Sequence, residues 1–391
     1  MRCVRIGFGK IARIHDEQLQ KHGVLTVGIL EVDPERIRAI EQVGLRAIGS
    51  LQEAVSIRPD FYDICTPTHA RLEILRQLCA LDPLANILIE KPICDFQDVA
   101  QIQQVLQQHR GRIVINENYA SSNVTLAVQD ELAIRGITPT RVIIESTKNR
   151  GADFLAGRFI DTRLGALGYE GSHLLALIGA FGEGYTKAHL LDSDIDNIAL
   201  SQPDFLPQET VHLVNQGGAF MKYQAKNGCI IELYSSMAGR IGFPCPPYAQ
   251  PDQVIGHLDV KTRFRILRTD GINAEGVAHQ IIGLFEPVQN LKRSQGLLLV
   301  FKNWVLESIS APIEDNTMSQ HLLRAIRFFE GSAPNPYSLE RGFDDVRMLR
   351  EWAESCWSND DDSNEELGRP DSVLERRTDA LRFKLPTSRL V

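Results

Sequence analysis

Val4-Arg5-Ile6-Gly7-Phe8-Gly9-Lys10-Ile11-Ala12 opens the chain with an apolar run, a pair of glycines and the start of a helical pattern. This order predicts a strand, a tight turn and a helix. The spacing Gly-x-Gly-x-x-Ala is typical of a loop that binds a dinucleotide, because the glycines allow the turn and the close approach of a pyrophosphate to the helix start. A plain surface turn is the alternative. The expected cofactor contacts in this loop are Gly7, Phe8, Gly9, Lys10, Ile11 and Ala12.

A second apolar run, Leu25 to Leu30, ends in Glu31, about twenty residues beyond the glycines, where an acidic residue binds the ribose hydroxyls of a dinucleotide. A carboxylate at this position accepts hydrogen bonds from the 2′-hydroxyl and repels a 2′-phosphate. Glu31 therefore favours NAD over NADP. The alternative is a solvated glutamate at the start of the loop Asp33-Pro34-Glu35.

Length and composition narrow the class of protein. The 391 residues predict two domains, and an apolar content of 43% suffices for a sizeable core. The net charge of −8 argues against nucleic acid or an anionic membrane as the main partner. The seven cysteines are scattered without a Cys-x-x-Cys pair, and the ten histidines are dispersed, so we expect reduced thiols, a cytoplasmic protein and no metal site. The start of the chain has no signal-peptide pattern, and its most apolar run, Leu174 to Phe181, is too short to span a bilayer.

Residues 1–118 alternate between strand-like and helix-like stretches, which predicts a parallel Rossmann-type sheet wrapped by helices. The expected strands are Cys3–Ile6, Leu25–Leu30, Phe61–Cys65, Ile87–Ile89 and Arg112–Ile115. The expected helices are Ile11–Lys21, Pro34–Val43, Leu51–Ser56, Ala70–Leu81 and Phe96–Gln108.

Two loops follow strands of this sheet, and ligands of open α/β sheets lie beyond the carboxyl ends of the strands. Thr66 and Pro67 are expected to flank the cofactor, with Pro67 at the first helical position, while His69 is either a cofactor contact or part of a helix cap. Glu90-Lys91-Pro92 follows the fourth expected strand. Lys91 can polarise or orient a substrate oxygen there, although most lysines are solvated surface charges.

Together these segments resemble the Gfo/Idh/MocA oxidoreductase family, named for glucose-fructose oxidoreductase and inositol dehydrogenase. The residues that carry the resemblance are Gly7 to Ala12, Glu31 with Asp33-Pro34-Glu35, Thr66-Pro67-Thr68-His69 and Glu90-Lys91-Pro92. The resemblance implies that Lys91 touches substrate and nicotinamide, that Glu90 lies in the cofactor site, and that Pro92 follows a cis peptide bond.

After residue 118 the pattern changes to a helix through about Ile134 and then to alternating apolar stretches with turns, which predicts a large, open, mainly antiparallel sheet. The turns are expected at Lys226-Asn227-Gly228 and Thr269-Asp270-Gly271. The expected strands are Arg141–Thr147, His212–Val214, Ala219–Gln224, Cys229–Ser235, Val260–Arg268, Leu297–Phe301 and Trp304–Ser308. The family resemblance implies an α+β domain whose open sheet face is covered in a homodimer or homotetramer.

Within this half, Glu170 and His173 lie three residues apart near the start of an apolar helix, where the carboxylate can orient the imidazole. The resemblance makes His173 the acid/base residue, and a local hydrogen bond at the helix start is the alternative. The family's aspartate falls on Tyr169, which leaves two alternatives: Glu170 substitutes for it by a shift of one residue, or the mechanism lacks this carboxylate. The expected substrate contacts are Tyr119, Tyr169, Glu170, Lys148 and Arg150, the last two of which could instead belong to a solvated loop.

The sequence thus predicts a NAD-binding domain at 1–118, a substrate and oligomerisation domain at 119–357 with closing helices Thr317–Phe329 and Leu339–Trp357, and an acidic linker and tail at 358–391. The expected activity is hydride transfer between nicotinamide and a secondary alcohol or ketone of a sugar, cyclitol or sugar-derived intermediate. Two alternatives remain open at this point: a hydrolase or lyase that uses NAD transiently, and a non-catalytic nucleotide sensor.

Overall fold

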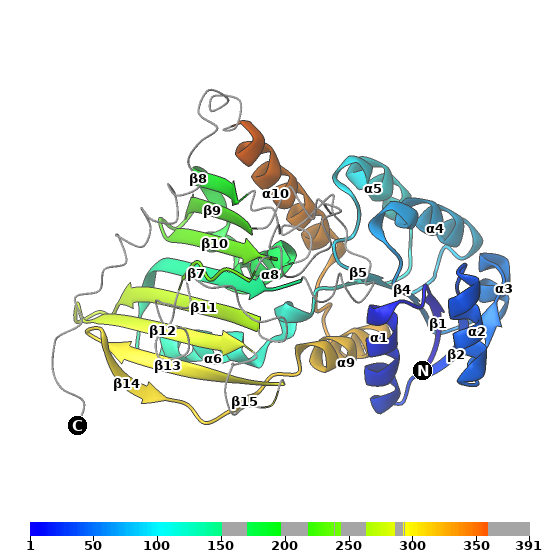
Figure 1. Ribbon diagram of the computed structural model, residues 1–391, viewed down its shortest axis with the longest axis horizontal. Helices are drawn as coiled ribbons and strands as arrows, with labels where there is room; N and C mark the ends of the chain where they lie inside the picture. Colours follow the sequence, from blue (N-terminus) through cyan, green and yellow to red (C-terminus); the bar gives the residue numbers. More distant parts are fainter. Residues whose placement is uncertain are drawn as a thin grey trace, which may run out of the picture.

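The computed structural model describes residues 1–150, 170–196, 218–237, 239–243, 263–285, 292 and 294–358. Two sheets dominate it, one in the first 116 residues and one in the rest of the chain, and they lie side by side with helices packed on both (Figure 1). This arrangement is the expected fold class, a Rossmann-type parallel sheet joined to an α+β part with a large, mainly antiparallel sheet.

The first sheet has six parallel strands in the order β3-β2-β1-β4-β5-β6. Their bounds are β1 Arg2–Ile6, β2 Leu25–Leu30, β3 Ala47–Ile48, β4 Phe61–Ile64, β5 Ile87–Glu90 and β6 Ile113–Asn116. The strand order reverses between β1 and β4, so the loops after these two strands border the crevice in which open α/β sheets bind ligands. The sequence missed only β3 in this sheet, because its two residues are too few to show alternation.

The helices of this part are α1 Lys10–Lys21, α2 Pro34–Gln42, α3 Leu51–Ser56, α4 Thr68–Leu81 and α5 Val99–Gln107, the last preceded by a 3-10 turn at Phe96–Asp98. Each lies within three residues of its expected bounds. The sequence predicts Pro67 as the first residue of α4. In the structure it is the N-cap, one position earlier. Its extended backbone sets the entry into the helix, whose first turn begins at Thr68.

The second sheet has nine strands among the described residues, in the order β14-β13-β12-β11-β7-β10-β9-β8, with β15 paired to β13. All of its pairs are antiparallel except β7 with β10. Their bounds are β7 Thr138–Lys148, β8 Lys187–Asp196, β9 Gly218–Ala225, β10 Ile230–Ser236, β11 Arg263–Ile272, β12 Ala278–Phe285, β13 Gln295–Lys302, β14 Val305–Ile309 and β15 Ile313–Glu314.

Several expectations for this sheet need correction. The structure adds β8, β12 and β15. The turn expected at Thr269-Asp270-Gly271 is wrong, because these residues continue β11 and the chain reverses later, at Asn273 to Gly276. Asp270 there accepts hydrogen bonds from Arg268 and Gln280, so its charge is matched within the sheet. The hairpin at Lys226-Asn227-Gly228 is confirmed, whereas the expected strand His212–Val214 and the tail at 359–391 lie outside the described residues.

The remaining helices connect the two parts. They are α6 Asn123–Ile134, α8 Ser172–Gly179, α9 Thr317–Phe329 and α10 Leu339–Ser358, with 3-10 turns at Asn118–Ser121 (η2) and Glu183–Tyr185 (η4). Helices α6 and α8 pack on the second sheet, whereas α9 lies beside α1 (Figure 1). Leu322, Ile326 and Phe329 of α9 share a buried cluster with Cys3, Phe61 and other side chains of the first sheet. A helix late in the chain therefore completes the N-terminal part.

The face of the second sheet away from these helices carries a separate apolar cluster with Ile143, Phe220, Tyr234, Phe264 and Leu299. These side chains are buried in the single chain. Exposed apolar side chains gather instead at β14 and the turn before it: Trp304, Val305, Leu306 and Ile309. Among the described helices, none combines the length and the apolar character needed to cross a membrane.

Candidate active site

The glycine loop has the geometry that the sequence predicts. Gly7 has a φ of +86°, and a Cβ there would meet Thr66 Cγ2 at 3.1 Å and the carbonyl of Cys65 at 3.2 Å, so this position requires glycine. A Cβ on Gly9, by contrast, would meet no protein atom within 4 Å. Gly9 is the N-cap of α1, and because glycine has no side chain, no side-chain cap occupies the first N–H groups of that helix. Ala12 is buried where α1 crosses the strands.

Glu31 lies beside this loop at the end of β2. One carboxylate oxygen accepts a hydrogen bond from the backbone N–H of Phe8 at 2.8 Å, and the other accepts from Val32 at 2.8 Å and Asp33 at 3.2 Å. The oxygen that binds Phe8 accepts only one of these hydrogen bonds and retains a lone pair, so the carboxylate can still accept a hydrogen bond from a ribose hydroxyl. A guanidinium nitrogen of Arg36 lies 3.7 Å from Glu31, which places one cation next to this carboxylate.

The loop after β4 is tied to the loop after β5 by a residue that the sequence did not single out. Arg71 of α4 donates to the carbonyl oxygen of Thr66 at 3.0 and 2.8 Å and also to the carbonyl oxygens of Glu90 and Pro92. Its side chain is buried. The peptide bond between Lys91 and Pro92 is cis, as the family resemblance implied. One guanidinium thus holds both predicted loops at the same edge of the sheet.

These features fit a bound dinucleotide. The loop leaves room at Gly9 for a close approach to the backbone, the start of α1 offers N–H groups to phosphate oxygens, and Glu31 is placed for a ribose. The hydroxyl of Thr66 is buried beside Gly7 and has no hydrogen-bond partner among the described residues, which is the kind of group that a ligand satisfies.

Glu90 belongs to a buried polar network. His15 of α1 contacts Glu90 through Nε2 at 2.8 Å and Asp63 through Nδ1 at 3.1 Å, and Asn116 donates to Glu90. Arg5 donates to Asp63 at 2.9 Å. Through these contacts the carboxylate of Glu90 links the end of β5 to α1, and its contact with a cofactor stays a prediction.

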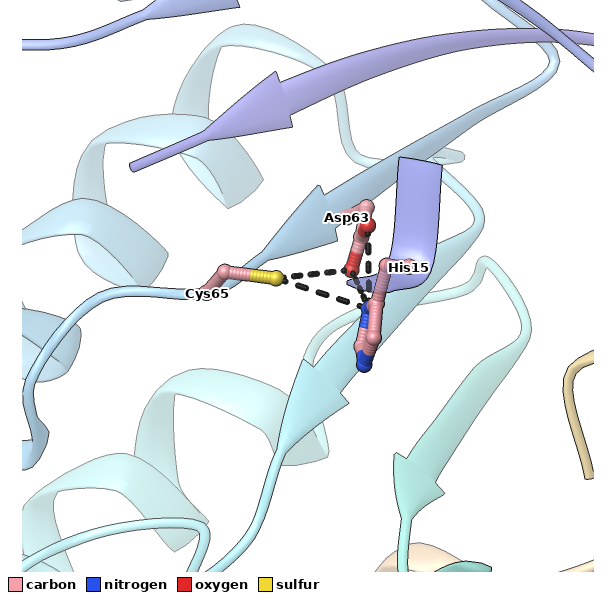
Figure 2. A group of neighbouring side chains, drawn as sticks. All are labelled: His15, Asp63 and Cys65. Carbon is pink, nitrogen blue, oxygen red and sulfur yellow. Dashed lines mark hydrogen bonds and ion pairs between the residues drawn. The ribbon is translucent and has the colours of Figure 1, made fainter. Parts of the chain in front are cut away.

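Figure 2 shows His15, Asp63 and Cys65 of this network pointing toward one another. Their potential metal-ligand atoms lie within 4.8 Å of one another, close enough to hold a metal ion. The sequence does not indicate this cluster, because α1 and β4 are far apart along the chain. Burial and the neighbouring Asp63 raise the pKa of the Cys65 thiol to about 12. Arg5 already neutralises Asp63, and both His15 nitrogens face carboxylates. These charges favour a hydrogen-bonded network over a cation site.

His173 lies near the start of α8, and its carboxylate partner is Glu117, not Glu170. The Nδ1 atom of His173 is 2.6 Å from Oε1 of Glu117, which directly follows β6 and is buried. Burial raises the pKa of Glu117, but His173, Lys91 and His321 together outweigh burial and the net pKa is lowered. An ionised Glu117 requires hydrogen on Nδ1 and so leaves Nε2 as the basic nitrogen of the imidazole. Sequence reasoning missed Glu117 because 56 residues separate it from His173.

Lys91 belongs to the same group of charges. Burial lowers the pKa of Lys91, and the carboxylates of Glu117 and Glu170 partly oppose this effect. Burial also lowers the pKa of His173, and Lys91 adds to that decrease while Glu117 opposes it. The imidazole is therefore neutral near pH 7 and able to accept a proton, with the Lys91 side chain close enough to act on it electrostatically.

Glu170 lies at the middle of a second buried group of polar side chains. Its carboxylate accepts hydrogen bonds from Arg265 at 2.6 Å, from Ser146 at 2.8 Å and from Arg150. Burial raises the pKa of Glu170, but Arg265 and Arg150 overcome burial and hold the pKa well below its usual range. The expectation that Glu170 orients His173 is wrong, because both of its oxygens are bound by the arginines and the serine.

The other predicted substrate contacts fall into three groups. Tyr119 packs its ring against His173 with centroids 4.6 Å apart, and its hydroxyl accepts from Arg265. Lys148 and Arg150 are buried at the end of β7 and beyond it, and are not in a solvated loop. His69 is exposed in the first turn of α4, and Tyr169 lies outside the described residues.

A cavity of about 560 Å³ between α5, β6 and α10 lies elsewhere. His109, Gly111 and Arg112 in its wall are at the amino end of β6. The glycine loop, Lys91 and Glu117 all follow the carboxyl ends of strands, so this cavity is not part of the candidate site.

A parallel sheet with this glycine loop and an acidic residue after its second strand defines a dinucleotide-binding fold. Comparison with protein families agrees with this assignment. Residues 1–117 match the family GFO_IDH_MocA, described as an oxidoreductase family with an NAD-binding Rossmann fold. The resemblance to Gfo/Idh/MocA proteins is therefore confirmed: this part of the chain is the family's NAD-binding domain, and the protein is an NAD-binding oxidoreductase.

Solved structures share the fold over nearly the whole chain. Scyllo-inositol dehydrogenase from Lactobacillus casei, solved with NAD(H) and scyllo-inositol, has a TM-score of 0.66 at 14% identity, covering 92% of this chain and 97% of its own. A myo-inositol dehydrogenase from Corynebacterium glutamicum has 0.64 at 16%, covering 92% and 97%. UDP-N-acetylglucosamine 3-dehydrogenase from Acidithiobacillus ferrooxidans has 0.60 at 14%, covering 91% and 97%. No curated protein matches the sequence.

Proposed function

We propose that this protein is a NAD(H)-dependent dehydrogenase or reductase that acts on a secondary alcohol or ketone of a polyol, sugar or sugar-derived compound. The observation that carries the proposal is the His173–Glu117 pair beside Lys91, at the edge of the sheet that also holds the glycine loop. The inositol and sugar-nucleotide dehydrogenases that share the fold support the substrate class.

The glycine loop and Glu31 would hold the nicotinamide cofactor, which would supply the hydride chemistry at the alcohol or ketone carbon. His173 removes the hydroxyl proton at Nε2 during oxidation and returns it during reduction. Glu117 fixes the ring orientation and stabilises the imidazolium that forms. Lys91 donates a hydrogen bond to the reacting oxygen and so holds it between the imidazole and the cofactor.

The test is cofactor binding and turnover with the purified protein. We expect NADH to bind more tightly than NADPH, and polyols or sugars to change the nicotinamide absorbance. His173→Asn and Lys91→Met should each lower kcat by about 10²- to 10⁴-fold while NADH binding is retained. Gln129→Asn, at the surface of α6, is the matched control.

Turnover that survives both substitutions would exclude these catalytic roles. Firm NADH binding without net redox on any polyol would favour the transient use of NAD in a hydrolase or lyase, or a nucleotide sensor. The proposal includes a cytoplasmic location and a homodimer or homotetramer. The exposed apolar side chains of β14 are a candidate contact surface for that oligomer, and sedimentation of the purified protein would determine its size.

A further inference from the structure

We infer that the cavity between α5, β6 and α10 is a second binding site, which takes a neutral polyhydroxylated compound such as a sugar or a cyclic polyol. Its volume of about 560 Å³ lies within the usual range of small-molecule sites, about 300–1,000 Å³. The residues that line it are all described by the structure, and none of them belongs to the candidate active site. The inference therefore does not depend on the proposed reaction.

The walls of the cavity come from segments that are far apart in the chain. Helix α5 and the start of β6 form one wall, and α10 with the end of α9 forms the other (Figure 1). Beside the cavity, α10 packs closely on β6: a Cβ on Gly342 would come within 2.8 Å of Ile115 Cγ1, and the N–H of Ile115 donates to the carbonyl of Tyr337 at 3.1 Å. The open space is thus a local feature of the wall and does not reflect loose packing of α10.

The polar groups of the walls include both acceptors and donors. The carboxylate of Glu340 has no hydrogen bond or ion pair among the described residues. Nε2 of His109 donates to the carbonyl oxygen of Ala85 at 2.7 Å, so Nδ1 of the neutral ring is an acceptor, and this buried atom has no partner in the described part of the chain. The amide oxygen of Gln103 accepts from Arg347 at 3.0 Å, which leaves its NH₂ group as a donor.

The charged side chains of the walls cancel one another. Arg347 forms an ion pair with Asp344 at 2.7 Å, and Arg112 donates to the carbonyl oxygens of the last two residues of α9. With Glu340, two guanidinium groups and two carboxylates line the cavity. The site therefore has no net charge that would select an anion or a cation over a neutral ligand.

Apolar side chains complete the lining. Leu106, Ile113 and Phe343 are buried, and the guanidinium of Arg112 lies over the ring of Phe328, 5.4 Å from its centroid. A cyclic sugar or polyol has hydroxyl groups around its ring and C–H groups on its faces. Each hydroxyl can both donate and accept, so it can use either kind of polar group in the wall, while the C–H groups pack on the apolar side chains. This combination is what points to a neutral polyhydroxylated ligand.

The experiment is a ligand-observed NMR titration of the intact protein with glucose and with myo-inositol. We expect Glu340→Leu to weaken binding by at least about tenfold, the contribution of one hydrogen bond to a charged group. Glu340→Gln keeps an oxygen acceptor and should weaken binding less. Glu354→Leu, at an exposed position later in α10, is the matched control and should leave binding unchanged. Thermal unfolding shows whether each variant is folded, and a bound ligand should raise the unfolding midpoint of the wild-type protein.

Charged analogues test the class of ligand. Glucose 6-phosphate and glucosamine should bind no more tightly than glucose, and added salt should have little effect on the affinity for glucose, because a neutral ligand gains little from long-range charge. Tighter binding of either charged compound, if Glu340→Leu abolishes it, would overturn the assignment to a neutral ligand.

The candidate active site can bind the same compounds, and Lys91→Met separates the two sites. Binding that Glu340→Leu weakens and Lys91→Met leaves intact supports the inference, whether or not the protein shows turnover. Full-strength binding in the Glu340→Leu protein, or no binding of any neutral compound, rejects the inference and leaves the oxidoreductase proposal to its own test. Two binding components, each lost in a different one of these variants, would support both sites.

Discussion

His173 is held by a carboxylate from the other half of the chain, and this contact sets the pH range in which the imidazole can work. Glu117 raises the pKa of His173 against burial, which lowers it. Together with Lys91 the pair forms the proposed acid/base group. The family's aspartate position, Tyr169, is not needed to supply the carboxylate.

Replacing Glu117 by Gln removes the interaction that raises the pKa of His173. As a base, His173 must be neutral, so the acidic limb of the kcat/KM profile for alcohol oxidation should move to lower pH. We also expect kcat to fall on the order of tenfold, as for a pKa displaced by about one unit, with KM little changed. Profiles of the Glu117→Gln protein and of a Glu307→Gln control would show this. A parallel drop at all pH values would contradict the assigned role.

Cofactor choice should depend on Glu31. Replacing Glu31 by Ser removes the proposed acceptor for the ribose hydroxyls and relieves the repulsion of a 2′-phosphate, next to which Arg36 already lies. NADH affinity should fall by roughly 10- to 100-fold, the value of one charge-assisted hydrogen bond, and NADPH affinity should rise. Fluorescence titration with both nucleotides measures the ratio. An unchanged ratio would rule out this part of the proposed site.

At the scale of the elements, the site depends on how the loops after β4 and β5 are joined. Arg71 reaches across from α4 to three carbonyl oxygens, one at Thr66 and the others on either side of Lys91. Secondary structure alone places these loops at the same edge of the sheet. The guanidinium fixes the distance between them.

Replacing Arg71 by Leu should loosen both loops and leave buried carbonyl oxygens without a donor. We expect a loss of about 3 kcal/mol in the free energy of unfolding, together with weaker NADH binding and a lower kcat, because hydrogen bonds from a charged donor contribute about 1.5–3 kcal/mol each. Denaturant unfolding and NADH titration test this. The same substitution at Arg76, an exposed residue of α4, is the control, and equal effects at both positions would disprove the linking role.

For the whole molecule, α9 follows the second sheet along the chain but packs on the first sheet and on α1. Its apolar face lies on the first sheet, while His321 on the same helix contacts Ser121 and the carbonyl of Ile115. Burial lowers the pKa of His321 to about 4, so this imidazole is neutral at pH 7 and bridges the segment after β6. The N-terminal part thus needs a helix supplied some 200 residues later.

Replacing Phe329 by Ala should remove about 3–5 kcal/mol from the free energy of unfolding, because this ring stacks on Phe61 in a buried cluster. We also expect both sheets to unfold in one transition at lower denaturant. Phe301→Ala, at the far end of β13, is the control for a phenylalanine remote from α9. An isolated N-terminal transition in the wild-type protein would show that α9 does not couple the two parts.

The sequence alone determined the parallel sheet, the glycine loop, Glu31 and the position of Lys91, because these depend on local spacing: an apolar run, a turn that only glycine allows, and a residue at a strand end. The tertiary structure determined which side chains contact one another in the site. Glu117 meets His173, Arg71 meets three carbonyls, and Glu170 turns to two arginines through contacts between segments far apart in the chain. Short strands such as β3, and a strand that continues through Asp270-Gly271, likewise depended on neighbouring strands. Local pattern specifies which elements form, while burial and charge pairing between distant elements determine which side chains meet.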